Sequence, residues 1–309
     1  MTRIACIGAG TVGHAWAVVF ARAGHEVALY DSKPGEVAGQ AFPAIRRTLG
    51  VLEDGGMLTE PVDVIAGRIS DSASIGEAVA GASYVQESVR EDLGVKRQVF
   101  AEIAAAAAPD TLLASSTSAL PGSGFMTEIE RPERALVAHP VNPPSFIPLV
   151  ELCGTGLTSP ETLAHARALL TEVGMKPITL NKEIDGFILN RLQYTLVAEA
   201  LHLVGEGYCS AEDIDRVMTE GLALRWAFLG PFAVAHLNAV DGFAGFVGRL
   251  GPMMRRMGED ARTAYPWTAE QIAAIHAELA STRPVTAIPT LQADRDAHIL
   301  ALRTLREQA

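Results

Sequence analysis

The chain has 309 residues, 49% of them hydrophobic and 20% charged, which is a globular composition and leaves room for two domains. Asp and Glu total 36 against 25 for Lys and Arg, and the resulting net charge of -11 argues against nucleic acid and anionic membranes as partners. The three cysteines, Cys6, Cys153 and Cys209, lack CxxC spacing, so we expect reduced thiols and no metal site.

The first residues contain no long apolar segment followed by a cleavage site, and no later apolar stretch is long enough to cross a bilayer. The sequence therefore predicts a cytoplasmic protein without a signal peptide or a membrane span.

Short β-branched runs alternate with amphipathic stretches over roughly the first 180 residues, a pattern typical of βα units. The predicted strands are residues 3–7, 26–30, 68–70, 84–87, 111–115, 135–139, 149–153 and 176–180. The predicted helices between them are residues 11–23, 34–50, 93–107 and 160–174. This order predicts an α/β fold, a Rossmann-type domain with a mostly parallel sheet.

Strand patterns end at about residue 181, and helical stretches follow at 183–208 and 211–220 and continue to the C-terminus. We therefore expect a nucleotide-binding domain over residues 1–182 and an all-helical domain over 183–309 for substrate binding and dimerisation. Several of its helices are apolar on more than one face, which predicts a two-fold symmetric homodimer.

A GxGxxG motif, Gly8-Ala9-Gly10-Thr11-Val12-Gly13, lies between the first strand and the first helix. Gly8 allows the tight turn, Gly10 lets a pyrophosphate approach the backbone, and Gly13 lets the helix pack on the strand. Together with Thr11 and Val12 at the helix N-terminus, these residues predict a dinucleotide site. A glycine-rich turn without a ligand and a site for FAD are the alternatives.

Asp31 ends the second predicted strand, 18 positions after Gly13. A carboxylate there accepts hydrogen bonds from the adenine ribose and repels a 2′-phosphate, so the cofactor is expected to be NAD and not NADP. The alternative is a helix cap, because Asp31 and Ser32 precede Pro34.

His139 ends a predicted strand, and Glu151 lies twelve residues later in an otherwise apolar strand. A buried carboxylate requires a partner, and a neighbouring imidazole would satisfy it while fixing the tautomer of the histidine. This arrangement predicts an acid/base pair. The alternative is a structural histidine and an edge-strand glutamate that faces water.

Ser118 follows a strand end in the run Ser115 to Ser118, and Asn190 is the one amide on an otherwise apolar helix face. Both are candidates for contact with the reacting oxygen of a ligand. A loop hydroxyl with local backbone bonds and a packing hydrogen bond are the alternatives.

These segments, together with several others, resemble the 3-hydroxyacyl-CoA dehydrogenase superfamily, and within it the lambda-crystallin branch of L-gulonate 3-dehydrogenases. The resemblance covers nearly the whole chain and fades after about residue 240. It is carried by GAGTVGHAW at 8–16, VRED at 89–92, SSTS at 115–118, HPVNPP at 139–144, PLVEL at 148–152, GFILNRLQY at 186–194 and GLALRWAFLGP at 221–231.

The resemblance implies that His139 is the acid/base, that Glu151 is its partner, and that Ser118 and Asn190 hold the reacting oxygen. It also implies cofactor contacts near the nicotinamide ribose by Glu91 and Lys96, and substrate contacts by Asn142 and Arg225. A surface salt bridge is the alternative for Arg225.

The expected reaction is NAD-dependent oxidation of the 3-hydroxyl of a small hydroxy acid of the L-gulonate type. One alternative is another 3-hydroxy acid, such as a carnitine-like one, or a 3-hydroxyacyl-CoA. Against CoA, residues 35–94 contain no lysine. The alternatives of other classes are a Ser118–His139–Glu151 hydrolase, although the serine lacks a GxSxG motif, and an NADH-binding structural protein like a crystallin.

Overall fold

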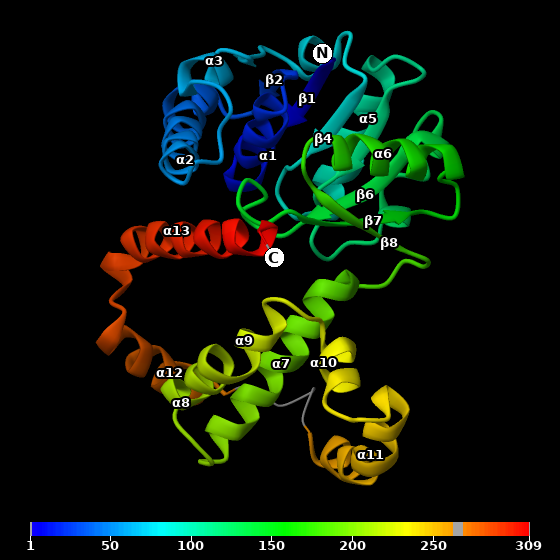
Figure 1. The fold of residues 1–309 in the computed structure, drawn as a ribbon. Helices are drawn as coiled ribbons and strands as arrows, with labels where there is room; N and C mark the ends of the chain where they lie inside the picture. Colours follow the sequence, from blue (N-terminus) through cyan, green and yellow to red (C-terminus); the bar gives the residue numbers. More distant parts are fainter. Residues whose placement is uncertain (1, 262–267, 309) are drawn as a thin grey trace. The chain divides into compact units, whose positions relative to one another are not determined.

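The computed structural model describes residues 2–261 and 268–308. The chain forms two compact units (Figure 1). The first consists of Met1–Asn190 with Asp296–Ala301, and the second consists of Arg191–Arg295 with Leu302–Ala309.

The first unit is built on an eight-stranded sheet in the order β3-β2-β1-β4-β5-β6-β7-β8. Strands β1 to β6 pair in parallel, β7 runs antiparallel to β6, and β8 is parallel to β7. This is the mostly parallel Rossmann-type sheet expected from the sequence. The strands are β1 (Arg3–Ile7), β2 (Glu26–Tyr30), β3 (Ile69–Asp71), β4 (Tyr84–Glu87), β5 (Leu112–Ser115), β6 (Ala135–Pro140), β7 (Leu149–Gly154) and β8 (Lys176–Leu180).

Helices cover both faces of this sheet and bury two apolar clusters against it. One cluster contains residues of α1 (Thr11–Arg22), α2 (Phe42–Asp54), α3 (Val62–Ala66) and α6 (Pro160–Glu172). The other contains residues of α4 (Ile75–Val79) and α5 (Leu93–Ala106). Shorter helical segments complete the unit: η1 (Val37–Ala41), η2 (Gly122–Gly124) and η3 (Pro132–Arg134).

The parallel strands bring their carboxyl ends to one edge of the sheet, where open α/β sheets bind ligands. The glycine loop follows β1, and Asp31 follows β2. The segment 88–92 follows β4, Ser118 lies in the loop after β5, and His139 is the second-to-last residue of β6. The sheet therefore gathers residues from five segments at one edge.

The described residues of the second unit form helices joined by turns, with no strand among them. Its elements are most of α7 (Phe187–Gly205), α8 (Ala211–Arg216), η4 (Val217–Leu222), α9 (Ala223–Trp226), α10 (Pro231–Leu237), α11 (Gly242–Asp260), α12 (Ala269–Thr282), η5 (Val285–Ala287) and the two ends of α13 (Ile288–Glu307). None of the helices in the described part of the chain is long and apolar enough to cross a membrane.

The two units do not divide at the expected position between residues 182 and 183. They divide inside α7, after Asn190, and residues 296–301 of α13 also belong to the first unit. The first turn of α7 stays with the sheet because the backbone N–H groups of Ile188 and Leu189 donate to Glu151 in β7. Leu300 of α13 is buried in the core of the first unit.

The helix expected from residue 34 starts three residues later, as η1, and continues as α2. Gly35 has a φ of 75°, a conformation that interrupts a right-handed helix. Asp31 therefore caps no helix: its carboxylate accepts hydrogen bonds from the backbone N–H groups of Ala9 and Lys33.

Candidate active site

The loop after β1 requires glycine at two of its three glycine positions because of its own packing. Gly8 has a φ of 100°, and a Cβ there would lie 2.6 Å from the carbonyl oxygen of Ser88. A Cβ on Gly13 would lie 1.7 Å from the carbonyl oxygen of Gly8. A Cβ on Gly10, in contrast, would meet no atom of the described chain within 4 Å. This open space beside Gly10 is where the GxGxxG motif predicts that a pyrophosphate approaches the backbone.

A cavity of about 800 Å³ opens above this loop. Its wall includes Gly8, Gly10, Thr11, Val12 and Asp31, five of the residues predicted to hold the cofactor. The 12-residue helix α1 starts at Thr11, so its free N–H groups and positive dipole end lie at the cavity wall. The glycine loop, the helix N-terminus and the size of the cavity all fit a dinucleotide.

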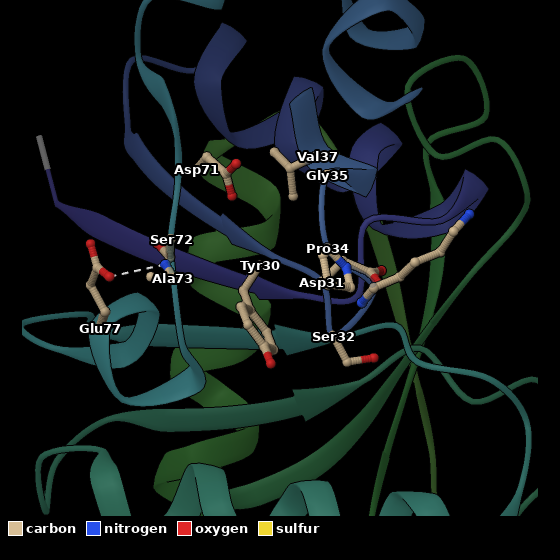
Figure 2. Close-up of a pocket in the computed structure, with 11 residues that line it drawn as sticks. Tyr30, Asp31, Ser32, Pro34, Gly35, Val37, Asp71, Ser72, Ala73 and Glu77 are labelled. Carbon is tan, nitrogen blue, oxygen red and sulfur yellow. Dashed lines mark hydrogen bonds between the residues drawn. The ribbon is translucent and has the colours of Figure 1, made fainter. Parts of the chain in front are cut away.

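A second cavity of about 450 Å³ shares Tyr30, Asp31 and Ser32 with the first (Figure 2). Asp71 and Glu77 supply two further carboxylates to its wall, and the Lys33 ammonium is paired with Glu36 at 2.6 Å. The surroundings of Asp31 are therefore acidic. This charge disfavours a phosphate on the ribose that Asp31 is expected to bind.

His139 and Glu151 are paired residues on the neighbouring strands β6 and β7. The His139 Nδ1 atom lies 2.9 Å from the Glu151 Oε2 atom, and the two side chains are 4% and 1% exposed. The other carboxylate oxygen, Oε1, accepts hydrogen bonds from the N–H groups of Ile188 at 3.0 Å and Leu189 at 3.1 Å.

The contact with an ionised Glu151 selects one tautomer of the imidazole. The two backbone N–H groups donate to Oε1, and the ionised form of Glu151 has no proton at Oε2 to give to Nδ1. The Nδ1 atom of neutral His139 must then carry the ring proton, and its Nε2 atom carries the lone pair. Nε2 has no hydrogen-bond partner among the described residues, so it is available to take a proton.

Phe187 packs against the same imidazole, with 5.1 Å between the two ring centroids. Its side chain is fully buried, and its backbone φ of 51° is uncommon for a residue with a side chain. Gly186 before it also has a positive φ, of 73°. This left-handed entry into α7 places the Phe187 ring on His139 while the next two N–H groups donate to Glu151.

The structure also connects Ser118 with Asn190. The Asn190 side-chain amide donates to the Ser118 carbonyl oxygen at 2.8 Å. Ser118 is exposed, and its hydroxyl makes no hydrogen bond with His139 in the described part of the chain. The direct Ser–His contact that a hydrolase triad requires is therefore not formed.

Glu91 holds the loop that carries Ser118. Its Oε1 atom accepts hydrogen bonds from the Thr117 hydroxyl at 2.5 Å and from the N–H groups of Ser118 and Ala119, both at 2.9 Å. Burial alone would raise the pKa of Glu91, but these hydrogen bonds and the nearby Lys96 charge hold it below its usual value. In this structure Glu91 therefore positions the loop.

Lys96, the other predicted contact to the nicotinamide ribose, is only 1% exposed and lines neither cavity. Its ammonium pairs with Glu87 at 2.9 Å and with Glu91 at 3.4 Å. Burial raises the pKa of Glu87, and Lys96 and the Ser115 hydroxyl oppose that shift. Sequence reasoning missed Glu87, although it is an acidic residue at the carboxyl end of β4, as Asp31 is just after β2.

Asn142 is exposed in the loop after β6, two residues beyond Pro140. Arg225 lies in α9, in the second unit, and is exposed without an ion pair to any described residue. The surface salt bridge considered for Arg225 is thus not formed within the described ranges. No group of three or more His, Cys, Asp or Glu side chains among the described residues could hold a metal ion.

Comparisons with known proteins assign both units to one family. The family profile "3-hydroxyacyl-CoA dehydrogenase, NAD binding domain" matches residues 3–184, and the profile "3-hydroxyacyl-CoA dehydrogenase, C-terminal domain" matches residues 186–286. Lambda-crystallin of Oryctolagus cuniculus is 41% identical over 253 residues, which is 81% of this chain and 79% of the relative.

Two further proteins extend the comparison. L-carnitine dehydrogenase of Streptomyces coelicolor is 38% identical over 272 residues, covering 86% of this chain and 80% of the relative. The crystal structure of FHMPC 5-dehydrogenase, described as an NAD+-dependent dismutase, superposes with a TM-score of 0.79 at 30% identity and covers 99% of both chains.

Proposed function

The chain belongs to the 3-hydroxyacyl-CoA dehydrogenase family and is an NAD-dependent dehydrogenase, and we propose that it oxidises the 3-hydroxyl of a small hydroxy acid, with His139 as the acid/base. The observation that carries this proposal is the buried His139–Glu151 pair, which leaves Nε2 of the imidazole as the proton acceptor. L-gulonate is our first candidate substrate, because the sequence resembles the lambda-crystallin branch. Carnitine is the second candidate, because relatives named as L-carnitine dehydrogenases match this chain.

In the oxidation direction, Nε2 of His139 takes the hydroxyl proton of the substrate. The ring then carries a positive charge, which the Glu151 carboxylate stabilises at 2.9 Å. When bound, NAD would supply the hydride acceptor at its nicotinamide ring, to which the hydrogen of the alcohol carbon passes with its electron pair. In the reverse direction the protonated histidine returns the proton to the oxygen.

We assign the binding of the reacting oxygen to Ser118 and Asn190. Their mutual hydrogen bond runs from the Asn190 amide to the Ser118 main-chain carbonyl, so the Ser118 hydroxyl remains available to a ligand. Glu91 holds the same loop through three hydrogen bonds and thereby limits the movement of that hydroxyl. We assign the substrate carboxylate to Arg225 and a further polar contact to Asn142.

The charges around residues 34–95 favour a small acid over a CoA ester. CoA carries several phosphates, and this region has four arginines and no lysine before Lys96. Two of these arginines are already neutralised: Arg46 pairs with Asp63 at 2.6 Å, and Arg68 pairs with Glu60 at 2.7 Å. Few cations remain there for a CoA phosphate to bind.

We further propose that the protein is a homodimer that pairs through its helical unit. Most of the exposed large hydrophobic side chains of the described residues lie in that unit. They include Phe232, Leu237, Val240 and Met257, which are between 61% and 108% exposed. Exposed apolar surface on this scale is typical of a surface that another protein covers.

The substrate assignment is tested by following NADH formation with L-gulonate, L-carnitine, 3-hydroxybutyrate and 3-hydroxybutyryl-CoA at equal concentrations. We expect kcat/KM to be highest for one of the two polar acids. A higher kcat/KM for 3-hydroxybutyryl-CoA than for all three free acids would contradict the proposal and favour a CoA ester.

A further inference from the structure

A buried network of polar side chains lies directly behind the cofactor loop, and its centre is the hydroxyl of Ser116. The Trp16 indole donates to Ser116 Oγ at 3.1 Å, and the Gln86 side-chain amide donates to the same atom at 2.7 Å. A serine oxygen accepts two hydrogen bonds and donates one. Both acceptor positions of Ser116 are therefore used.

The orientation of the Gln86 amide, on which this depends, is determined by its other partners. The Tyr84 hydroxyl lies 2.6 Å from Gln86 Oε1, and the Ala138 carbonyl oxygen lies 3.4 Å from Gln86 Nε2. A carbonyl oxygen only accepts, so the atom beside Ala138 must be the nitrogen. Gln86 thus donates to Ser116 and cannot accept from it.

The remaining contact of Ser116 is to Ser88, whose Oγ lies 2.9 Å away. Since Ser116 has no acceptor position left, its own proton must go to Ser88. Ser88 therefore accepts from Ser116, and its own hydroxyl proton has no acceptor among the described residues.

Ser88 lies on the wall of the 800 Å³ cavity and against the glycine loop. Its carbonyl oxygen is the atom that a Cβ on Gly8 would meet at 2.6 Å, and its Cβ lies 3.5 Å from the position of a Cβ on Gly13. The segment of a dinucleotide nearest to this loop is the pyrophosphate with its neighbouring ribose.

We propose that Ser88 donates a hydrogen bond to an oxygen of the pyrophosphate bridge or of the nicotinamide-side ribose of the bound cofactor, and that Trp16, Gln86 and Ser116 orient this donor. The network makes Ser88 a donor before the cofactor arrives, so little rotational freedom of the hydroxyl is lost on binding. Ser88 is thus a cofactor-binding residue, and Ser116 is a positioning residue. The inference depends on the NAD site and is independent of which acid is oxidised.

The first test is isothermal titration calorimetry of Ser88→Ala with NADH and with AMP. Loss of one hydrogen bond should weaken NADH binding about 3- to 10-fold. AMP lacks the pyrophosphate bridge and should bind as it does to the wild type. Ser83→Ala, just before the other end of β4, is the matched control and should leave both affinities unchanged. Ser88→Cys, with a weaker donor, should fall between wild type and Ser88→Ala.

An unchanged NADH affinity in Ser88→Ala would overturn the proposal, as would an equal loss for AMP, which would place the contact on the adenosine half. Failure of the wild type itself to bind NADH would instead contradict the cofactor assignment, so the two failures are distinguishable.

The orienting role of Ser116 is tested by a double-mutant cycle on NADH affinity. In a Ser116→Ala background the Ser88 hydroxyl is no longer directed, so Ser88→Ala should cost less affinity there than in the wild type. The melting temperature of each variant shows that the fold is retained. Equal losses in the two backgrounds would show that Ser116 does not orient Ser88.

Discussion

His139 and Glu151 are twelve residues apart in the chain and directly opposite each other on β6 and β7, with 2.9 Å between Nδ1 and Oε2. The antiparallel register of these two strands brings the residues together. The same carboxylate accepts the first N–H groups of α7, at Ile188 and Leu189. Glu151 therefore links the imidazole to the segment at which the helical unit begins.

Glu151→Gln should lower kcat about 100-fold or more while leaving NADH affinity close to that of the wild type. The glutamine oxygen can still accept from the helix, but its amide then faces Nδ1 of His139 as a donor. That contact favours the tautomer with a proton on Nε2, which cannot act as a base. Steady-state kinetics and an NADH titration measure the two effects, and Glu53→Gln, at an exposed position of α2, is the control. A kcat within threefold of the wild type would refute this role.

The variants Glu151→Gln and His139→Ala should also be strongly non-additive. Both residues serve one proton transfer, so adding the second change to the first should cost little further turnover. A double-mutant cycle on kcat measures this. Losses that multiply would mean that Glu151 does not act through His139.

Asp31→Ser should raise KM for NAD and reduce the preference for NAD over NADP. The substitution removes the carboxylate that repels a 2′-phosphate and that accepts from Ala9 and Lys33. The ratio of kcat/KM for the two cofactors measures the change. Asp71→Asn, across the cavity of Figure 2, is the control for a general loss of negative charge. If the ratio stays constant in Asp31→Ser, Asp31 does not contact the ribose.

Glu91→Gln should make the free energy of unfolding less sensitive to acid. The pKa of Glu91 is lower in the folded protein than its usual value, so its contribution is complete above the unfolded pKa and is lost as the pH falls through the folded pKa. Wild type should therefore lose more stability than Glu91→Gln between about pH 5 and pH 3. Urea unfolding at several pH values measures this, with Glu172→Gln, at an exposed position of α6, as the control. Parallel pH curves would argue against the prediction.

Sedimentation equilibrium should give twice the chain mass of 32.7 kDa at micromolar concentration. A dimer that folds as it associates should also melt at a higher temperature when the protein is more concentrated. A 32.7 kDa species over the whole range would rule out the homodimer.

Much of the fold could be predicted because β-branched runs and helix caps are local signals. All eight strands lie within one residue of their predicted positions at their starting ends. The pairing of His139 with Glu151 could be anticipated because a carboxylate in an apolar strand requires a partner. The resemblance to the family, which the profiles confirm, supplied the remaining site residues.

What could not be predicted depends on contacts between distant segments. The first unit extends to Asn190 because Glu151 accepts from the start of α7, and no local pattern shows this. Lys96 of α5 is buried against Glu87 of β4. No local sequence pattern indicates that this pairing keeps Lys96 out of the walls of both cavities. The hydrogen-bonded network of Ser116 joins side chains 100 positions apart at its widest.

The most direct test of the account is kcat of His139→Gln at saturating NAD and substrate, with NADH binding as the control for folding. Glutamine is close to histidine in size but cannot take a proton. Loss of a general base typically lowers the rate about 10²- to 10⁴-fold, and we expect kcat to fall by that amount while NADH binds as in the wild type. A kcat within tenfold of the wild type would contradict the role of His139 as the acid/base.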